Sequence, residues 1–414
     1  MNEARFKIGL VLIGAAAAWS VPFLMFVPGD FVGFLGPWYR HMLTAGPVAA
    51  FAHPFGNYAP PYLYLLAALT LFNGIVSQII AIKLLSTAGA AWLAFAIFRL
   101  LKSSGANDPV EAAAWSLVLP TVVLNVPLLA QADAFWVAPC VLAVAASVRG
   151  NAIQTALWAS VGFAFKAQAV FLAPFVALVL IRCHARWWAW LVPVAVYLFA
   201  ITPAWAAGWP LRDLLTIYLR QAQWHPPGDS FISTAPNLWL LVKLYAPFLY
   251  SAAAGIAAAG VAALVYIVWL RRATLGTQSL VAAAALSGAI IPFLLPGMHE
   301  RFFALSEILT FCLAWMSRRW LVIAAAAQAA FLLNAGGMLG GPPLMLLLGV
   351  AAETAVILLL VRTACRSAET SQTVEAGIAS RDLDSKIAAE SDLCGRKTRV
   401  GCVTERVETG RIAG

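Results

Sequence analysis

Polar and ionisable side chains interrupt long apolar stretches at several places in this sequence. His299, Glu300 and Arg301 stand side by side between two segments that are apolar enough to enter lipid. Asp30 follows the first apolar segment, and Asp133 separates two others. Polar groups at the level of a membrane are costly and usually serve a function. These residues are therefore the first candidates for chemistry.

Two of the carboxylates lie where a base or a polar binding group would be useful. Asp30 is predicted to act as a general base just above the bilayer, or simply to cap the helical turn that begins at Phe31. Gln131 and Asp133 lie beside Trp136 and suit a ligand with polar groups and an apolar face, such as a sugar. Capping of the following helix is the alternative for Asp133.

A lysine among apolar residues is a further unusual feature. Lys166, with Gln168 two residues later, needs an anion or a water-filled cavity unless it snorkels to the surface. A phosphate would be a natural partner for such an ammonium group. The loop 207–247 interleaves polar and aromatic side chains, which suits a carbohydrate or lipid-phosphate surface but also anchoring in the headgroup region. Its candidate binding residues are Gln221, Asn237 and Trp239.

The run of three ionisable residues at 299–301 is predicted to contact phosphate or another part of the substrate. Arg301 would be the cation, and His299 a hydrogen-bond donor or proton carrier. Glu300 would orient Arg301. The alternative is a salt-bridged helix start, with Glu300 near the positive end of the helix and Arg301 snorkelling.

The composition places these residues in a membrane protein. Of the 414 residues, 62% are hydrophobic and only 11% are charged, with a mean hydropathy of +0.84. A soluble fold cannot bury that much apolar surface, so we expect an all-α, polytopic membrane domain over residues 1–362. Residues 363–414 are rich in Ser, Thr and charge, and we expect a disordered cytoplasmic tail without chemistry.

The distribution of the net charge of +9 argues against nucleic acid as a partner. The tail carries eight basic and eight acidic residues, which leaves nineteen basic and ten acidic residues in 1–362. The basic residues gather at the ends of apolar segments, as in Arg271 and Arg272, which is typical of cytoplasmic loops that set a membrane topology.

If each basic cluster is cytoplasmic, the chain crosses the membrane about twelve times. Both termini are then cytoplasmic, and the candidate residues lie on the external side, where loops would form the active site. The Asn73-Gly74 break in 60–101 permits either a short helix with one crossing or three crossings, and 152–165 is short enough to be partial or tilted. The expected crossings are 8–27, 60–101, 109–128, 133–149, 152–165, 167–183, 187–206, 248–270, 278–296, 302–317, 320–338 and 342–362, within a range of about ten to fourteen.

Six motifs, in one order along residues 1–362, resemble those of a known family. They are GDFVGFLGPWYRHMLTAG, NYAPPYLYLL, QADAFWV, FKAQAVFLAPF, APNLW and GMHERFF. The chain thereby resembles bacterial membrane proteins related to the second mannosyltransferase of GPI-anchor assembly, in the C-type glycosyltransferase superfamily. Ala132 and Phe302 depart from the residues frequent at those positions; neither change removes a charge, although the donor could differ.

The resemblance implies a glycosyltransferase of the bacterial inner membrane with an extracytoplasmic active site. Its donor would be a polyprenyl-phosphate monosaccharide, carrying mannose or a similar hexose, and its acceptor a glycan or glycolipid. In such enzymes a carboxylate in the first external loop commonly serves as the base, and Asp30 holds the matching position. The other matching positions, whose individual roles stay open, are Asp133, Lys166, Gln168, Asn237, His299, Glu300 and Arg301.

The chemistry of such a donor agrees with these residue types. A lipid phosphate is already a leaving group, so transfer needs a base for the acceptor hydroxyl and cations for the departing phosphate. Asp30 can supply the first, and Lys166 and Arg301 the second; displacement by a single nucleophile would invert the anomeric centre. We expect no cofactor. The sequence contains no Cys-x-x-Cys pair and no His/Cys cluster, so a metal site is not indicated, although a divalent ion is compatible with the reaction.

Two other classes of protein remain open from the sequence. A transporter or flippase of lipid-linked sugars also needs many helices and buried polar groups, but predicts binding residues near the midplane and often an internal repeat. A non-catalytic subunit of a polysaccharide assembly complex is the third possibility, and it would tolerate the loss of Asp30.

Overall fold

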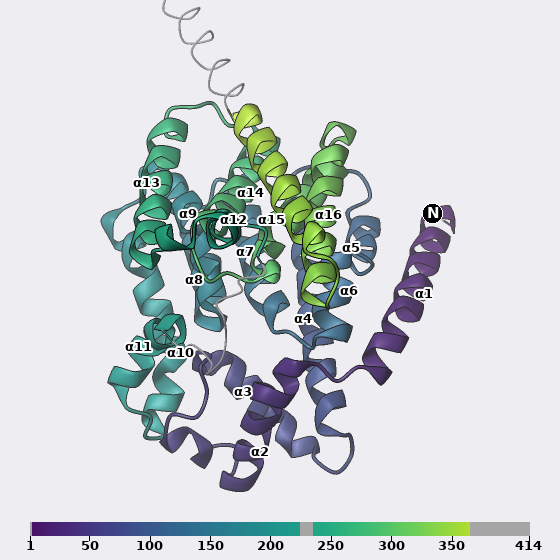
Figure 1. Cartoon of the computed structure of the whole chain (residues 1–414), viewed down its shortest axis with the longest axis vertical. Coiled ribbons are helices and arrows are strands. Elements are labelled where there is room, and N and C mark those ends of the chain that lie inside the picture. Colours follow the sequence, from purple (N-terminus) through teal and green to yellow (C-terminus); the bar gives the residue numbers. More distant parts are fainter. Residues whose placement is uncertain (1, 224–234, 365–414) are drawn as a thin grey trace, which may run out of the picture.

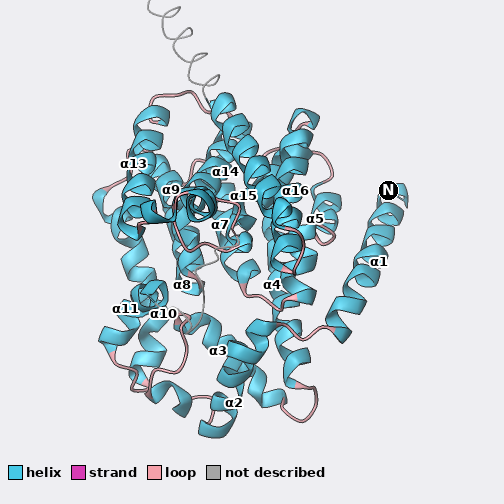
Figure 2. Cartoon of the chain, in the orientation of Figure 1, coloured by secondary structure: helices cyan, strands magenta, loops and turns pink. Residues whose placement is uncertain are grey.

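The computed structural model describes residues 2–223 and 235–364, and these residues form a helical protein without a named strand (Figures 1 and 2). The expectation of an all-α fold is therefore confirmed. The predicted tail lies outside the described residues, apart from its first two positions, and so does the middle of the loop 207–247.

The helices vary widely in length. Short 3-10 or π segments precede or interrupt several of them; those nearest the candidate residues are η1 (Phe31–Leu35), η4 (Leu124–Leu128), η5 (Ala167–Leu172) and η8 (Glu300–Phe303). The α-helices are α1 (Asn2–Met25), α2 (Gly36–Ala45), α3 (Pro60–Leu69), α4 (Gln78–Ser103), α5 (Pro109–Ser116), α6 (Pro120–Val123), α7 (Asp133–Val148), α8 (Ala152–Phe165), α9 (Ala173–Arg182), α10 (Val192–Ala206), α11 (Leu211–Gln223), α12 (Leu238–Tyr245), α13 (Ala252–Leu270), α14 (Thr277–Leu294), α15 (Ala304–Met316) and α16 (Leu321–Met338), followed by the helix Pro343–Ala364.

Seven helical segments in the described part of the chain are long and apolar enough to cross a membrane. An eighth crossing results if the bent pair Pro109–Ser116 and Pro120–Leu128, whose axes differ by 48°, counts as one span. The protein is therefore membrane-spanning by the length and composition of its helices. The seven are Phe6–Leu24, Gln78–Ser103, Trp187–Ala206, Ala252–Leu270, Thr277–Leu294, Arg318–Met338 and Pro343–Ala364.

The structure differs from the expected twelve crossings where helices are short. The expected crossings at 133–149, 152–165 and 167–183 correspond to apolar helices of 10–17 residues, and the one at 302–317 to α15, with 13 residues. All four are below the roughly 20 residues that span a bilayer without distortion. Within 60–101 a short helix, α3, precedes the single long helix α4, which confirms the first of the two alternatives for this segment. Gly74, with a φ of +89°, makes the break.

The described chain has two distinct ends along its long axis. Helix α1 starts, and the helix Pro343–Ala364 finishes, toward the upper end of the view in Figure 1, whereas α2 and α3 lie at the lower end. The side of the membrane that each of these ends faces stays a prediction of the parity argument.

Helix α7 lies in the middle of the helical core. Every residue from Asp133 to Ser147 is buried. Two glycines let neighbouring helices approach it closely: a Cβ at Gly89 of α4 would meet the Phe135 ring at 2.9 Å, and a Cβ at Gly162 of α8 would meet the Trp136 carbonyl oxygen at 3.0 Å. Small residues have this role at helix contacts in membranes. The start of α7, and with it Asp133, is consequently held on all sides.

The end of α1 is attached to α4 by a buried lysine. The Lys83 ammonium group donates hydrogen bonds to the carbonyl oxygens of Pro22, Phe23 and Phe26 at 2.7, 2.8 and 2.7 Å. These carbonyls come from the last turn of α1 and the residues just after it, where oxygens lack helical partners. Lys83, which the sequence alone could not place, therefore fixes the chain directly before Asp30.

We expect Lys83→Met to lower the free energy of unfolding by about 1–3 kcal/mol, because it leaves buried carbonyl oxygens without a donor. Thermal unfolding of the purified protein in detergent measures the change. Lys102→Met, at an exposed position near the other end of the same helix, is the matched control and should change the unfolding temperature little. Equal unfolding temperatures for the Lys83 variant and the wild type would contradict this role.

Candidate functional site

Asp30 lies between α1 and η1, with its side chain 34% exposed. Its Oδ2 atom accepts a hydrogen bond from Nε2 of Gln131 at 2.7 Å and lies 3.2 Å from Nη2 of Arg301. The side chain makes no capping hydrogen bond to the helical turn that follows. The cap alternative for Asp30 is therefore wrong, and its carboxylate is directed to residues distant in sequence.

Asp133 is the anion that Lys166 requires. The Lys166 ammonium group lies 2.8 Å from Oδ1 of Asp133, and the indole N–H of Trp136 donates to the same oxygen at 2.8 Å. Both charged residues are 2% exposed, so Lys166 does not snorkel to the surface. Asp133 is the first residue of α7 rather than its N-cap, and the N-cap position, Ala132, makes no side-chain capping bond.

Arg301 joins the two carboxylates into one cluster. Its Nη2 contacts Asp30 at 3.2 Å and its Nε lies 3.8 Å from Oδ2 of Asp133. We call Asp30, Gln131, Asp133, Lys166 and Arg301 the charged cluster. Two carboxylates and two cations balance its formal charge, which is how proteins keep charges inside a low-dielectric region. Four segments separated by up to 271 positions in sequence, from Asp30 to Arg301, converge here.

The charged cluster shifts the pKa values of Asp30 and Arg301. Burial alone would raise the pKa of Asp30, but the Arg301 guanidinium and the Gln131 hydrogen bond outweigh burial and hold that pKa below its ordinary value. Burial alone would lower the pKa of Arg301, whereas Asp30 and Asp133 raise it. Asp30 is therefore a carboxylate, and Arg301 a cation, throughout the neutral range.

Aromatic rings form one wall of the cluster. The Lys166 ammonium group lies over the Tyr58 ring at 5.4 Å and the Phe302 ring at 5.9 Å from their centroids. The His299 ring packs edge-on against Phe302 at 5.3 Å and is itself exposed. Tyr58 was not among the predicted binding residues, although it lies in the motif NYAPPYLYLL. Cations held against ring faces are stabilised by the ring quadrupole.

Gln168 and Glu300, both predicted to bind substrate, are buried and lie within two residues of Lys166 and Arg301 in the chain. Gln168 is 7% exposed in η5, and its Oε1 atom is buried without a hydrogen-bond partner among the described residues. Glu300 is 1% exposed. Burial alone would lower the pKa of Arg301, and the charge of Glu300 adds to those of Asp30 and Asp133, which raise it. The predicted orienting role of Glu300 stays a prediction.

Asn237 and Trp239 position the chain that carries Arg301 instead of touching the charged cluster. The Asn237 amide donates to the carbonyl oxygen of Leu295 at 2.9 Å, and its Oδ1 caps α12 by accepting from the N–H of Leu240. The Trp239 indole donates to the carbonyl oxygen of Leu294 at 2.6 Å. Both bonds attach α12 to the end of α14, a few residues before His299.

Gln221, on α11, is half-buried, and no contact joins it to the charged cluster within the described ranges. The structure thus brings Asp30, Gln131, Asp133, Lys166 and Arg301 together, with His299, Glu300 and Gln168 adjacent in the chain. It does not bring Gln221, Asn237 or Trp239 into the same cluster. Residues 224–234 of their loop lie outside the described residues.

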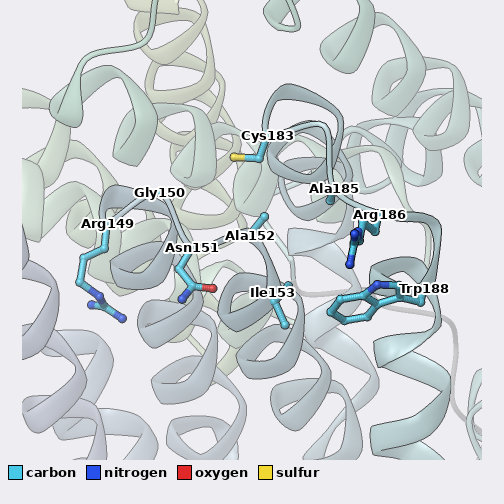
Figure 3. Close-up of a pocket in the computed structure, with 9 residues that line it drawn as sticks. All are labelled: Arg149, Gly150, Asn151, Ala152, Ile153, Cys183, Ala185, Arg186 and Trp188. Atoms are coloured by element: carbon cyan, nitrogen blue, oxygen red, sulfur yellow. The ribbon is translucent and has the colours of Figure 1, made fainter.

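A separate cavity lies away from the charged cluster (Figure 3). Its volume is about 370 Å³, and its lining includes Arg149, Asn151, Arg186 and Trp188. Arg149 follows the last residue of α7, at the opposite end of that helix from Asp133. Figure 3 shows the side chains of Arg149 and Arg186 at opposite sides of this cavity. Their position agrees with a basic membrane surface rather than with the charged cluster.

A metal centre is not apparent in the part of the chain that the structure describes, where no three His, Cys, Asp or Glu side chains could hold an ion together. Comparison of the chain with protein-family models and with curated proteins gives no match. What the fold and the charged cluster define is therefore a class: a helical, membrane-spanning protein with a balanced group of buried charges.

Proposed function

We propose that the protein is an integral-membrane, inverting glycosyltransferase of the C-type superfamily. It moves mannose or a similar hexose from a polyprenyl-phosphate donor to a glycan or glycolipid acceptor, on the extracytoplasmic side of the bacterial inner membrane. The observation that carries the proposal is the bridge of Arg301 between Asp30 and Asp133. It places a free carboxylate edge and a cation side by side, which are the two groups that this reaction needs.

Asp30 has an oxygen available for the acceptor. Oδ2 is occupied by Gln131 and Arg301, whereas Oδ1 has no hydrogen-bond partner in the described part of the chain. In the proposed reaction Oδ1 takes the proton from the acceptor hydroxyl while that oxygen attacks the anomeric carbon. The bond from this carbon to the phosphate oxygen breaks, and the configuration inverts. The low pKa of Asp30 keeps it ionised and ready at neutral pH.

The cations stabilise the departing lipid phosphate. Arg301 is 15% exposed at its side chain, so part of its guanidinium group remains accessible to a ligand beside the two carboxylates. Its neighbour His299, which is exposed, can donate a further hydrogen bond. Lys166, buried against Asp133, adds positive charge behind them. Donors arranged in advance around a developing negative charge are usually the largest single contribution to catalysis.

The pH dependence of transfer should reflect Asp30. Because Asp30 works as the anion and its pKa is held below the ordinary value, activity should be constant through the neutral range and fall only in acid, below the usual range of aspartate titration. Gln131→Leu removes a hydrogen bond to the charged form, so the acidic limb should move to higher pH. Gln278→Leu, where the amide contacts Arg319 and Trp320, should leave the limb in place. A Gln131→Leu profile identical to the wild-type profile would contradict this assignment.

The function is tested with purified protein in nanodiscs and a panel of polyprenyl-phosphate sugars that includes mannose and glucose donors. Mass spectrometry of added glycan and glycolipid acceptors detects a product one hexose heavier. We expect such a product with one donor, and no requirement for a nucleotide sugar. If polyprenyl-phosphate hexoses give no product while a nucleotide sugar does, the proposed donor class is wrong.

A further inference from the structure

Glu307 is a buried carboxyl group that the proposed reaction does not use. It lies in the first turn of α15 and is 1% exposed. The Thr121 hydroxyl oxygen lies 2.5 Å from Oε2 of Glu307 and 3.0 Å from Oε1 of Gln328. Thr121 is in α6, directly after the bend in the broken span. Irregular backbone at membrane depth occurs where protein or a cavity covers it, and polar residues there are functional by default.

The hydrogens available to Glu307, Thr121 and Gln328 indicate whether Glu307 is protonated. The backbone N–H of Thr121 donates to Oε1 of Gln328 at 3.2 Å, which fixes the orientation of the amide. The Thr121 hydroxyl has one hydrogen and two acceptor oxygens beside it. If Glu307 were ionised, the single hydrogen of the Thr121 hydroxyl could serve only one of these two oxygens. The other contact would then bring the lone pairs of two oxygen atoms together. If Glu307 is protonated, it donates to the Thr121 oxygen, and the Thr121 hydroxyl donates to Gln328, so that every contact is a hydrogen bond.

A second buried carboxyl group lies near this level of the membrane. Gly349 leaves space for the Asn334 side chain, so the helix Pro343–Ala364 packs closely against α16 there. The two helices are consecutive and antiparallel, so Glu353, one turn beyond Gly349, comes level with the part of α16 near Gln328. Glu353 is 1% exposed. No Lys, Arg or His within the described ranges forms an ion pair with either carboxyl group.

A small cavity connects Thr121 with the charged cluster. Its volume is about 20 Å³, and its lining includes Thr121, Asn125 and Asp133. A cavity of this size holds one water molecule when two or more polar groups line it. Oδ1 of Asn125, in a residue that is 4% exposed, has no hydrogen-bond partner among the described residues. Oδ2 of Asp133 accepts no hydrogen bond either, apart from its ion pair with Arg301.

We propose that Glu307 is a proton-binding site in the membrane domain, and that Thr121 and one water in this cavity connect its proton to Asp133 of the charged cluster. In a transfer along this path, the Thr121 hydroxyl turns from Gln328 to the water and passes its own proton to it while accepting the proton of Glu307. The water passes one of its protons to the Asp133 carboxylate, so the Glu307 O–H bond breaks and an O–H bond forms on Asp133. Glu307 becomes an anion and Asp133 becomes neutral, so the total charge is unchanged. The charged groups acting on Glu307 include Glu353, Glu300 and Asp133, all acidic.

This arrangement couples proton binding to the charge of the cluster. Any gain of negative charge near Asp133 favours the proton on Glu307, and by reciprocity a proton on Glu307 favours the binding of an anion at the cluster. The proton site itself does not depend on the proposed glycosyl transfer, and its tests use no sugar donor.

Infrared difference spectroscopy of the purified protein tests the proton directly. We expect the wild-type protein at neutral pH to show a protonated-carboxyl C=O band that shifts in D₂O and is lost in Glu307→Gln. Glu353→Gln is the matched control and should keep the Glu307 band. Thr121→Val should move the band to higher frequency, because the Glu307 carboxyl group loses its hydrogen bond to Thr121. This shift assigns the band to Glu307 even if Glu307→Gln does not fold. Carboxylate bands in place of the C=O band in the wild type minus Glu307→Gln difference would overturn the proposal.

The connection to the charged cluster is tested by titrating the same band. Asp133→Asn removes a neighbouring negative charge, so the pH at which the band disappears should fall by about one unit. Asp30→Asn should lower it less, since Asp133 lines the cavity beside Thr121 and Asp30 does not. Asn125→Leu, which removes an acceptor for the water, should slow hydrogen–deuterium exchange of the band. An unchanged midpoint in Asp133→Asn, or unchanged exchange in Asn125→Leu, would contradict the path.

Discussion

Replacing Asp30 with Asn should lower sugar transfer by roughly 100- to 10,000-fold, the contribution expected of a general base, and should leave the fold intact. The amide keeps the size of the carboxylate and can still contact Gln131. It cannot accept the proton of the acceptor hydroxyl. The amide oxygen can take the place of Oδ2 beside Gln131 and Arg301, so the substitution leaves neither donor without an acceptor. Initial rates with a polyprenyl-phosphate hexose, together with thermal unfolding, separate the chemical effect from the structural one.

Asp213→Asn supplies the matched control for this substitution. Asp213 also pairs with an arginine, Arg220, at 3.0 Å, but on the surface of α11. The chemical change is identical, and transfer should stay within about twofold of the wild type, because exposed ion pairs contribute little. Wild-type turnover in Asp30→Asn would make the assignment of the base wrong and would favour a non-catalytic role for the cluster.

Lys166→Met should produce the largest loss of stability, about 3–5 kcal/mol, because it leaves the buried Asp133 carboxylate without its closest cation. The two side chains are each 3% exposed and their charged atoms lie 2.8 Å apart. Arg301, 3.8 Å from the other carboxylate oxygen, compensates only in part. Denaturant unfolding in mild detergent measures the change.

A double-mutant cycle separates the ion pair from simple loss of packing. Asp133→Asn in the Lys166→Met background removes the unpaired charge, so the double variant should be more stable than Lys166→Met alone. Arg220→Met, which breaks the exposed pair with Asp213, should cost no more than about 1 kcal/mol. A double variant less stable than Lys166→Met would show that the carboxylate of Asp133 is stabilised by other groups.

The sequence predicted the class of fold well because membrane helices are encoded by local composition. The long apolar runs at 252–270 and 277–294 needed no tertiary information. Helix α7 was harder, since its 16 residues are apolar on every side but too short for an unstrained crossing. Only its neighbours, packed at Gly89 and Gly162, decide that it lies in the core.

The charged cluster was predictable in membership but not in its pairing. Parity placed Asp30, Asp133 and Arg301 on one side of the membrane, which made their convergence reasonable. The bond between Asp133 and Lys166 depends on how α7 and α8 pack, and nothing local in the sequence encodes that contact. For Asn237 and Trp239, composition suggested binding, whereas their hydrogen bonds to the end of α14 need the folded chain.

The sequence also marks the two buried carboxyl groups, although it does not indicate their partners. Glu307 interrupts the apolar segment after Arg301, and Glu353 interrupts the last one. An ionisable residue in such a segment marks a functional site by default. The partner that gives Glu307 its meaning, Thr121, lies 186 positions away on a short helix beyond a bend, and sequence spacing could not have indicated it.

We propose that the protein transfers a sugar from a lipid phosphate and does not merely move the lipid. The most direct measurement uses sealed proteoliposomes that contain a labelled polyprenyl-phosphate hexose and an acceptor on the outside, with wild-type protein and Asp30→Asn side by side. We predict labelled glycosylated acceptor from the wild type and very little from Asp30→Asn. Movement of the labelled donor across the bilayer without any glycosylated product, equal in both proteins, would contradict the claim.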